Sequence, residues 1–135
     1  MPQLDHLGIA VQSIDQARKL YESLGLQVVH EETIEHEGVR TALIPAGDAR
    51  IGLLEPTSPD SPVGRFLAKR GEGLHHIALH VENISAALET LKAQDARLIS
   101  EELQIGAGGH LYFFVHPSSA GGVLLEICQD AVSDV

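Results

Sequence analysis

The sequence predicts an α+β fold made of two tandem βαβββ modules, whose curved sheets pair around a cavity. Three observations support this prediction: one segment occurs twice, each copy changes from strand-like to helix-like periodicity, and a helix-like linker separates the copies. We expect a single domain over residues 1–135, with module one at about 3–56, a linker helix at about 61–71 and module two at about 73–129. Neither half, of about 60 residues, would bury enough surface alone.

The repeat places LDHLGIAVQSIDQA at 4–17 over LHHIALHVENISAA at 74–87. His6 and His76 are matched, and so are four apolar pairs, namely Leu4 and Leu74, Val11 and Val81, Ile14 and Ile84, and Ala17 and Ala87. In each copy bulky apolar residues alternate with a histidine and small residues, which indicates a strand with two different faces. If the modules pair, His6 and His76 converge on one site. The alternative is that both are ordinary strand histidines that form hydrogen bonds with the backbone.

A helix follows the first strand of each module. Ser13 and Gln16 form a capping-box pattern at the start of one helix, and Gly25 follows its end. The other helix is expected to start near Ser85. Three short strands complete each module, at about 26–33, 38–45 and 50–55 in module one and at about 97–103, 110–116 and 122–128 in module two.

The linker between the modules has its own helix signals. Ser61 is a good N-cap, Pro62 suits the first helical position, and Gly71 suits the position just after the last helical residue. A short helix at about 61–71 is therefore expected.

Glu126 is the most informative acidic residue, because it interrupts the apolar strand pattern GGVLLEIC. Burial of a carboxylate is costly unless it is paired or binds a metal. An exposed position on an edge strand is the alternative. Together with His6 and His76, Glu126 makes a candidate metal site, and the fold then encloses a metal-site cavity.

The other histidines are less suited to join this site. His75 should point to the opposite sheet face from His76, and His80, roughly 13 Å further along the strand, can only line the cavity. His116 precedes Pro117 and is expected to have a turn role. Three histidines are expected at the surface: His30, His36 and His110.

Composition excludes several classes of function. The net charge of −10 argues against nucleic acid and anionic membranes as partners. A membrane-spanning helix needs about 18 consecutive apolar residues, and the sequence contains no apolar run of that length. The sequence also contains no signal-peptide pattern. The single cysteine, Cys128, cannot form an intramolecular disulfide, so a cytoplasmic location is expected.

Three stretches carry a resemblance to the vicinal oxygen chelate superfamily, which includes glyoxalase I, bleomycin resistance proteins and extradiol dioxygenases. They are LDHLGIAV, SPDSPVGRFLAKRGEGLHHIAL, and the run from IGAGG through FFVHPSSAGGVLLEI. The last two resemble the methylmalonyl-CoA epimerase family in particular. The likeness covers residues 3 to about 129. It implies that His6, His76 and Glu126 are metal ligands.

Four positions bear on how far the resemblance extends to the chemistry. The family's fourth ligand, a Glu or Gln, falls on Gly52, so water is expected to replace it. Simple overlay of RIGLLEPT on GGVLLEIC instead matches Glu55 with Glu126, which leaves Glu55 as an alternative ligand on the other strand face. A glutamate proposed as a base in some members is Thr41 here, and a family Lys is Ser118.

The resemblance implies an isomerase that interconverts (2R)- and (2S)-methylmalonyl-CoA through a metal-stabilised enolate, with Glu126 in proton transfer. The cofactor would be one divalent ion, among Co, Zn, Mn, Ni and Fe(II), and the partner an acyl-CoA thioester, with a homodimer as a further expectation. A basic cluster could meet the CoA phosphates or be an ordinary solvated helix face: Arg65, Lys69 and Arg70. For the second acid–base group, Glu37, Glu55 and water are open candidates.

Two other functions remain open. One is a glyoxalase-type lyase or isomerase acting on a thiol adduct. The other is a metal-free, drug-sequestering binding module, which the loss at Gly52 favours. The retained His6, His76 and Glu126 favour an enzyme, because a sequestering protein does not need all three.

Overall fold

The computed structural model describes residues 1–130, which fall into two compact units. The first unit is His6–His75, and the second combines Met1–Asp5 with residues 76–130. Each unit follows one predicted module closely, and the α+β class with its repeated βαβββ order is confirmed. The organisation of residues 1–135 as a single domain stays a prediction.

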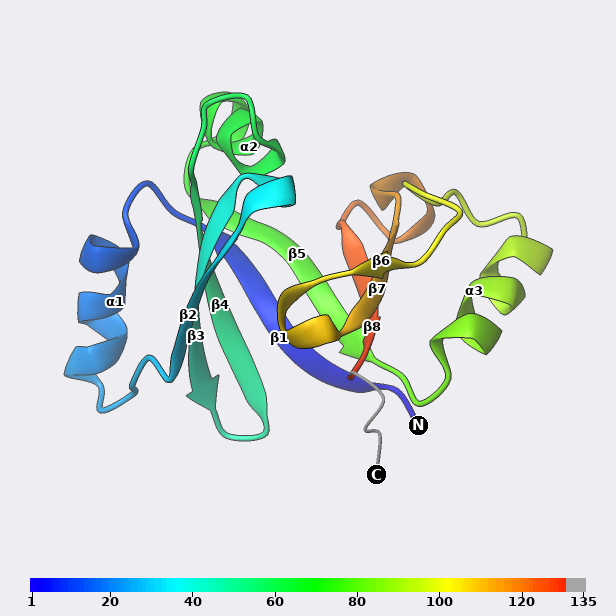
Figure 1. The fold of residues 1–135 in the computed structure, drawn as a ribbon, viewed down its shortest axis with the longest axis horizontal. Helices are drawn as coiled ribbons and strands as arrows, with labels where there is room; N and C mark the ends of the chain where they lie inside the picture. The colour runs from blue at the N-terminus through cyan, green and yellow to red at the C-terminus, as the bar shows by residue number, and fades with distance from the viewer. Residues whose placement is uncertain (131–135) are drawn as a thin grey trace. The chain divides into compact units, whose positions relative to one another are not determined.

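The first unit contains four strands, with β1 joining it from His6 onward, and two α-helices: β1 (Gln3–Ala10), α1 (Ile14–Ser23), β2 (His30–Ile34), β3 (Val39–Ala46), β4 (Ala49–Pro56) and α2 (Pro62–Arg70). The strand order is β2-β3-β4-β1, with β1 and β4 parallel and the other pairs antiparallel. Helix α1 packs on one sheet face through Ile14, which joins Ala42, Ile44 and Leu53 in a buried cluster (Figure 1). Helix α2 buries the opposite face, where Val63 and Leu67 pack with Ala10, Val39 and Leu54.

The second unit repeats this plan without a counterpart of α2: β5 (Gly73–His80), α3 (Ile84–Ala93), β6 (Gln104–Ile105), β7 (Leu111–Val115) and β8 (Leu125–Gln129). Its strand order is β5-β8-β7-β6, with β5 and β8 parallel and the other pairs antiparallel. Helix α3 packs on this sheet through Ile84 and Leu88, which contact the cluster of Phe113, Val115 and Ile127.

The helix starts follow from local chemistry, largely as the sequence predicts. Ser13 Oγ accepts a hydrogen bond from the Gln16 N–H at 3.2 Å, and Ser61 Oγ accepts one from Gly64 N–H at 3.1 Å. Helix α3 starts at Ile84, next to the predicted Ser85, and Asn83 is its N-cap. Within the described residues, no helix has the length and apolar character to cross a membrane.

The prediction of a strand at 97–103 is wrong for most of that segment. Leu98 forms a single bridge to Val115, and β6 begins only at Gln104. Between them the Ser100 hydroxyl accepts a hydrogen bond from the Glu102 N–H at 3.2 Å. Local side-chain to backbone bonds of this kind compete with sheet pairing, which explains why the strand is interrupted.

Candidate functional site

The second unit holds a buried pair formed by His76 and Glu126. His76 lies on β5 and Glu126 on the neighbouring strand β8, where Ala78 is its register partner. The two residues are each 6% exposed, and His76 Nε2 lies 3.4 Å from Glu126 Oε1. The predicted burial of Glu126 is thus confirmed. A buried carboxylate beside a buried imidazole is costly without a positive partner, so the pair suits a cation.

Aromatic side chains of β7 surround this pair. Phe114 is the register partner of Glu126, and its ring meets the His76 ring edge-on at 5.9 Å between centroids. Tyr112 packs against Phe114 in the same way, at 5.6 Å. This apolar surrounding lowers the local dielectric and strengthens any electrostatic interaction of Glu126.

His110, which is predicted at the surface, is half-buried in the structure. Its side chain is 29% exposed, and its Nε2 lies 3.9 Å from Glu126 Oε2. His110 therefore approaches one carboxylate oxygen while His76 approaches the other. The sequence contains a signal for this position, because the spacing by two of His110, Tyr112 and Phe114 predicts that they share one strand face. Phe114 is the register partner of Glu126, so this is also the face of Glu126.

In the first unit, His6 lies on β1 next to β4. The face of β1 that carries His6 also carries the buried residues Gly8 and Ala10. Across the strand pair, a Cβ atom added to Gly52 would lie 3.8 Å from His6 Cδ2. The face predicted for Gly52, the one shared with His6, is therefore confirmed.

The strand registers decide between Gly52 and Glu55 as the counterpart of Glu126. Gly8 pairs with Gly52 on β4, and Ala78 pairs with Glu126 on β8. Gly8 and Ala78 are matched positions of the repeat, so Gly52 is the structural counterpart of Glu126. The simple sequence overlay of Glu55 on Glu126 is three residues out of register.

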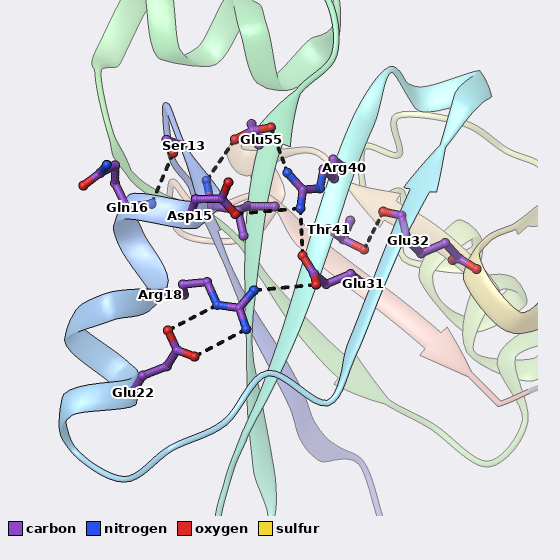
Figure 2. A network of polar contacts seen from close by, with 11 residues as sticks. Ser13, Asp15, Gln16, Arg18, Glu22, Glu31, Glu32, Arg40, Thr41 and Glu55 are labelled. Atoms are coloured by element: carbon purple, nitrogen blue, oxygen red, sulfur yellow. Dashed lines mark hydrogen bonds and ion pairs between the residues drawn. The ribbon is translucent and has the colours of Figure 1, made fainter.

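Glu55 instead binds the start of helix α1. Its Oε1 accepts a hydrogen bond from the Ile14 N–H at 2.9 Å, and its Oε2 lies 3.6 Å from Arg40 (Figure 2). In the second unit, Gln129 Oε1 accepts the corresponding bond from the Ile84 N–H at 2.8 Å. Both side chains satisfy a free N–H at a helix N-terminus. Glu55 therefore points to the α1 face of the sheet, away from the face of His6.

The remaining histidines mostly follow their predictions. His75 packs edge-on against Phe66 of α2 at 5.0 Å, on the other face from His76, and burial lowers its pKa. His116 caps the turn at Pro117–Ser119, where its Nδ1 accepts from the Ser118 N–H at 3.0 Å. His80 lies 3.4 Å from the exposed carboxylate of Asp130. Two others are exposed as predicted: His30 and His36.

The basic residues of the linker lie at the surface of α2. The side chains of Arg65, Lys69 and Arg70 are exposed, and Arg70 extends over the Phe66 ring at 5.8 Å from its centroid. Three exposed cations on one short helix make a local excess of positive charge in a chain whose net charge is −10.

Comparison with known proteins gives a consistent result. A sequence profile of the Glyoxalase/Bleomycin resistance protein/Dioxygenase superfamily matches residues 5–114. The uncharacterized protein YqjC of Bacillus subtilis is 45% identical over 130 residues, which cover 96% of this chain and 93% of YqjC. Human mitochondrial methylmalonyl-CoA epimerase is 40% identical over 129 residues, which cover 94% of this chain and 73% of the human protein.

A solved structure extends the comparison to the fold. It is a methylmalonyl-CoA epimerase in complex with methylmalonyl-CoA and NH4+, 35% identical to this chain, with a TM-score of 0.92. The match covers 98% of this chain and 96% of that one.

Proposed function

The chain belongs to the glyoxalase/bleomycin resistance protein/dioxygenase superfamily and is an epimerase within it, and from this premise we propose that it interconverts (2R)- and (2S)-methylmalonyl-CoA with one divalent metal ion. The buried pair of His76 and Glu126 is the observation that carries the proposal, because it gives a chain with epimerase relatives a charged group suited to proton transfer and metal binding.

His6, His76 and Glu126 are the proposed metal ligands. Two imidazole nitrogens and a carboxylate oxygen form a set that could hold one ion, and this donor set suits Co, Zn, Mn, Ni or Fe(II). The buried carboxylate of Glu126 supports the assignment, since a cation would offset its burial. When bound, such an ion supplies Lewis-acid stabilisation of negative charge on the substrate oxygens.

Gly52 determines how many protein ligands this site has. As the counterpart of Glu126, it occupies the place from which module one would supply its own carboxylate, and it has no side chain to do so. We therefore propose three protein ligands, and water or substrate oxygens would fill the remaining positions on a bound ion. Glu55 is not proposed as a ligand, because it binds the α1 N-terminus.

The reaction is a proton removal at C2 and a proton return on the opposite face. The C2–H bond lies between a thioester carbonyl and a carboxylate, so its electron pair can move into the carbonyl as the proton leaves. Glu126 is the group proposed to take or return the proton on one face. The apolar rings of Tyr112 and Phe114 exclude water near this carboxylate.

The proposed substrate is an acyl-CoA thioester, as in the relative solved with methylmalonyl-CoA. The exposed cations of α2 are proposed to meet its phosphates: Arg65, Lys69 and Arg70. The chain has a single cysteine, the buried Cys128, which supports the proposed cytoplasmic setting. The expected homodimer stays a prediction.

The test is a proton-exchange assay in D₂O with methylmalonyl-CoA. The protein is first stripped with EDTA and then reloaded with Co, Mn or Zn, and deuterium at C2 is followed by NMR. We expect exchange and inversion only after reloading. Conversion of a thiol adduct without exchange at C2 would favour the glyoxalase activity. Binding of small ligands without metal or turnover would favour the sequestering module.

A further inference from the structure

Glu126 has two carboxylate oxygens, and the second unit brings a different histidine to each of them. His76 Nε2 lies 3.4 Å from Oε1, and His110 Nε2 lies 3.9 Å from Oε2. A carboxylate that binds a metal ion through one oxygen is oriented by whatever group holds the other oxygen. All three residues belong to the second unit, so this arrangement lies within one compact part of the chain.

His110 reaches Glu126 from some distance along the sheet. Phe114 is the register partner of Glu126, and His110 precedes it by four residues, which is about 13 Å of extended backbone. The side chains of His110 and Glu126 therefore meet only because both lean along the strands toward each other. On the way, the His110 ring lies beside the Tyr112 ring, with 5.4 Å between centroids and 33° between planes.

Gly106 provides the space for this orientation of the His110 ring. A Cβ atom added to Gly106 would lie 2.5 Å from His110 Cε1, 2.9 Å from Tyr112 Cε1 and 3.0 Å from His110 Nε2. The backbone of Gly106 is not in the left-handed region, so its conformation does not require a glycine. The glycine is required instead by the ring that lies against it.

The hairpin between β6 and β7 fixes the base of the His110 side chain. The Gly106 N–H donates to the His110 carbonyl at 2.9 Å, and the Gly109 N–H donates to the Gly106 carbonyl at 3.0 Å. Strand pairing continues from there with Ile105 opposite Leu111. A side chain that is anchored in this way loses little further conformational entropy when it binds a carboxylate.

The surroundings of the contact favour a hydrogen bond from His110 to Glu126. The Glu126 side chain is 8% exposed beside the Phe114 ring, and a bond to a charged oxygen is strong where the dielectric is low. The distance of 3.9 Å is about 1 Å longer than such a bond. Hydrogen bonds in active sites often reach their full strength only when substrate binds.

We propose that His110 is a positioning residue for Glu126, an inference that rests on the proposed function. The His110 Nε2–H donates to Glu126 Oε2 and keeps Oε1 beside His76, the neighbouring proposed ligand. A neutral imidazole is sufficient, because it carries one N–H. His110 thereby reduces the cost of ordering the carboxylate for metal binding and for proton transfer.

The test compares His110→Phe with His110→Gln. Phe keeps a ring against Gly106 and Tyr112 but has no N–H, whereas the Gln amide places an N–H donor close to the position of Nε2. The dissociation constants of Co and Zn are measured on the full chain by competition with a chromophoric chelator. We expect His110→Phe to raise them by about 10- to 100-fold, and His110→Gln to recover most of the loss.

His30→Phe is the matched control. His30 Nε2 also lies 3.9 Å from a carboxylate oxygen, Glu32 Oε1, but its side chain is 58% exposed. This substitution removes the same group from a solvated pair, so the dissociation constants should not change.

Gly106→Ala tests the space beside the ring. Its Cβ would displace His110, so it should weaken metal binding as His110→Phe does. In a His110→Ala background no ring remains to be displaced, and Gly106→Ala should then have little further effect on metal binding. Nitrogen NMR of the Zn-loaded protein should show the proton of the neutral His110 ring on Nε2. Thermal unfolding checks that each variant is folded.

Metal affinity in His110→Phe equal to that in His30→Phe overturns the inference. Equal losses in folded His110→Phe and His110→Gln also overturn it, because they would show that the ring only packs. Additive effects of Gly106→Ala and His110→Ala, or a His110 ring with its proton on Nδ1, have the same consequence. A wild-type protein that binds no metal refutes the proposed function itself, and the inference with it.

Discussion

Gly52→Glu tests the register argument on which the ligand assignment depends. A Cβ atom at this position would have three neighbours at ordinary contact distance, Leu7 O at 3.7 Å, His6 Cδ2 at 3.8 Å and Leu43 Cδ1 at 3.8 Å. The backbone of Gly52 is not in the left-handed region, so a side chain causes no strain there. The substitution should therefore fold normally and place a carboxylate on the face of His6.

The expected effect is tighter metal binding. Replacing a water ligand with a tethered carboxylate should lower the metal dissociation constant by about tenfold or more, equivalent to about 1.4 kcal/mol. Competition against a chromophoric chelator at several concentrations measures this constant. Gly52→Gln is the matched control, because it has nearly the same size without the charge and should gain less.

Glu55→Ala completes the comparison. It removes the acceptor for the Ile14 N–H, so we expect a loss of about 1 kcal/mol in the free energy of unfolding and no change in metal affinity. Loss of metal in Glu55→Ala, together with no gain in Gly52→Glu, would refute the register argument. Glu55 would then be the fourth ligand, through a local distortion of β4.

Four further substitutions test the site and the fold. His6→Ala and His76→Ala should each remove most of the bound metal, and stoichiometric metal in the double variant, measured by elemental analysis, would disprove the assignment. Glu126→Gln, compared at equal metal content, should slow deuterium exchange at C2 by at least about 100-fold, and full exchange would leave Glu126 a structural role. Gly64→Ala should lower the free energy of unfolding by about 1–3 kcal/mol, because its Cβ would lie 2.5 Å from the Ser58 carbonyl oxygen. Unchanged thermal unfolding would contradict this close packing.

The sequence alone determined the matched histidines and every element except the strand predicted at 97–103. The period of two around His6 and His76 gave the first strand of each module, and Ser61, Pro62 and Gly71 gave both ends of α2. These signals depend on residues close in the chain, where side-chain alternation and helix capping act. The burial of Glu126 could be predicted for the same reason, since its strand is apolar on either side.

Tertiary structure alone decided which strand positions face one another. The choice of Gly52 over Glu55 and the approach of His110 to Glu126 both follow from register and cross-strand neighbours. A shift of one residue in register moves every side chain of a strand to the other face of the sheet. Where small residues line a cavity, the hydrophobic pattern of the sequence is a weak guide to this register. The module ends RIGLLE and VLLEIC look alike along the chain, and only their pairing with β1 and β5 separates them.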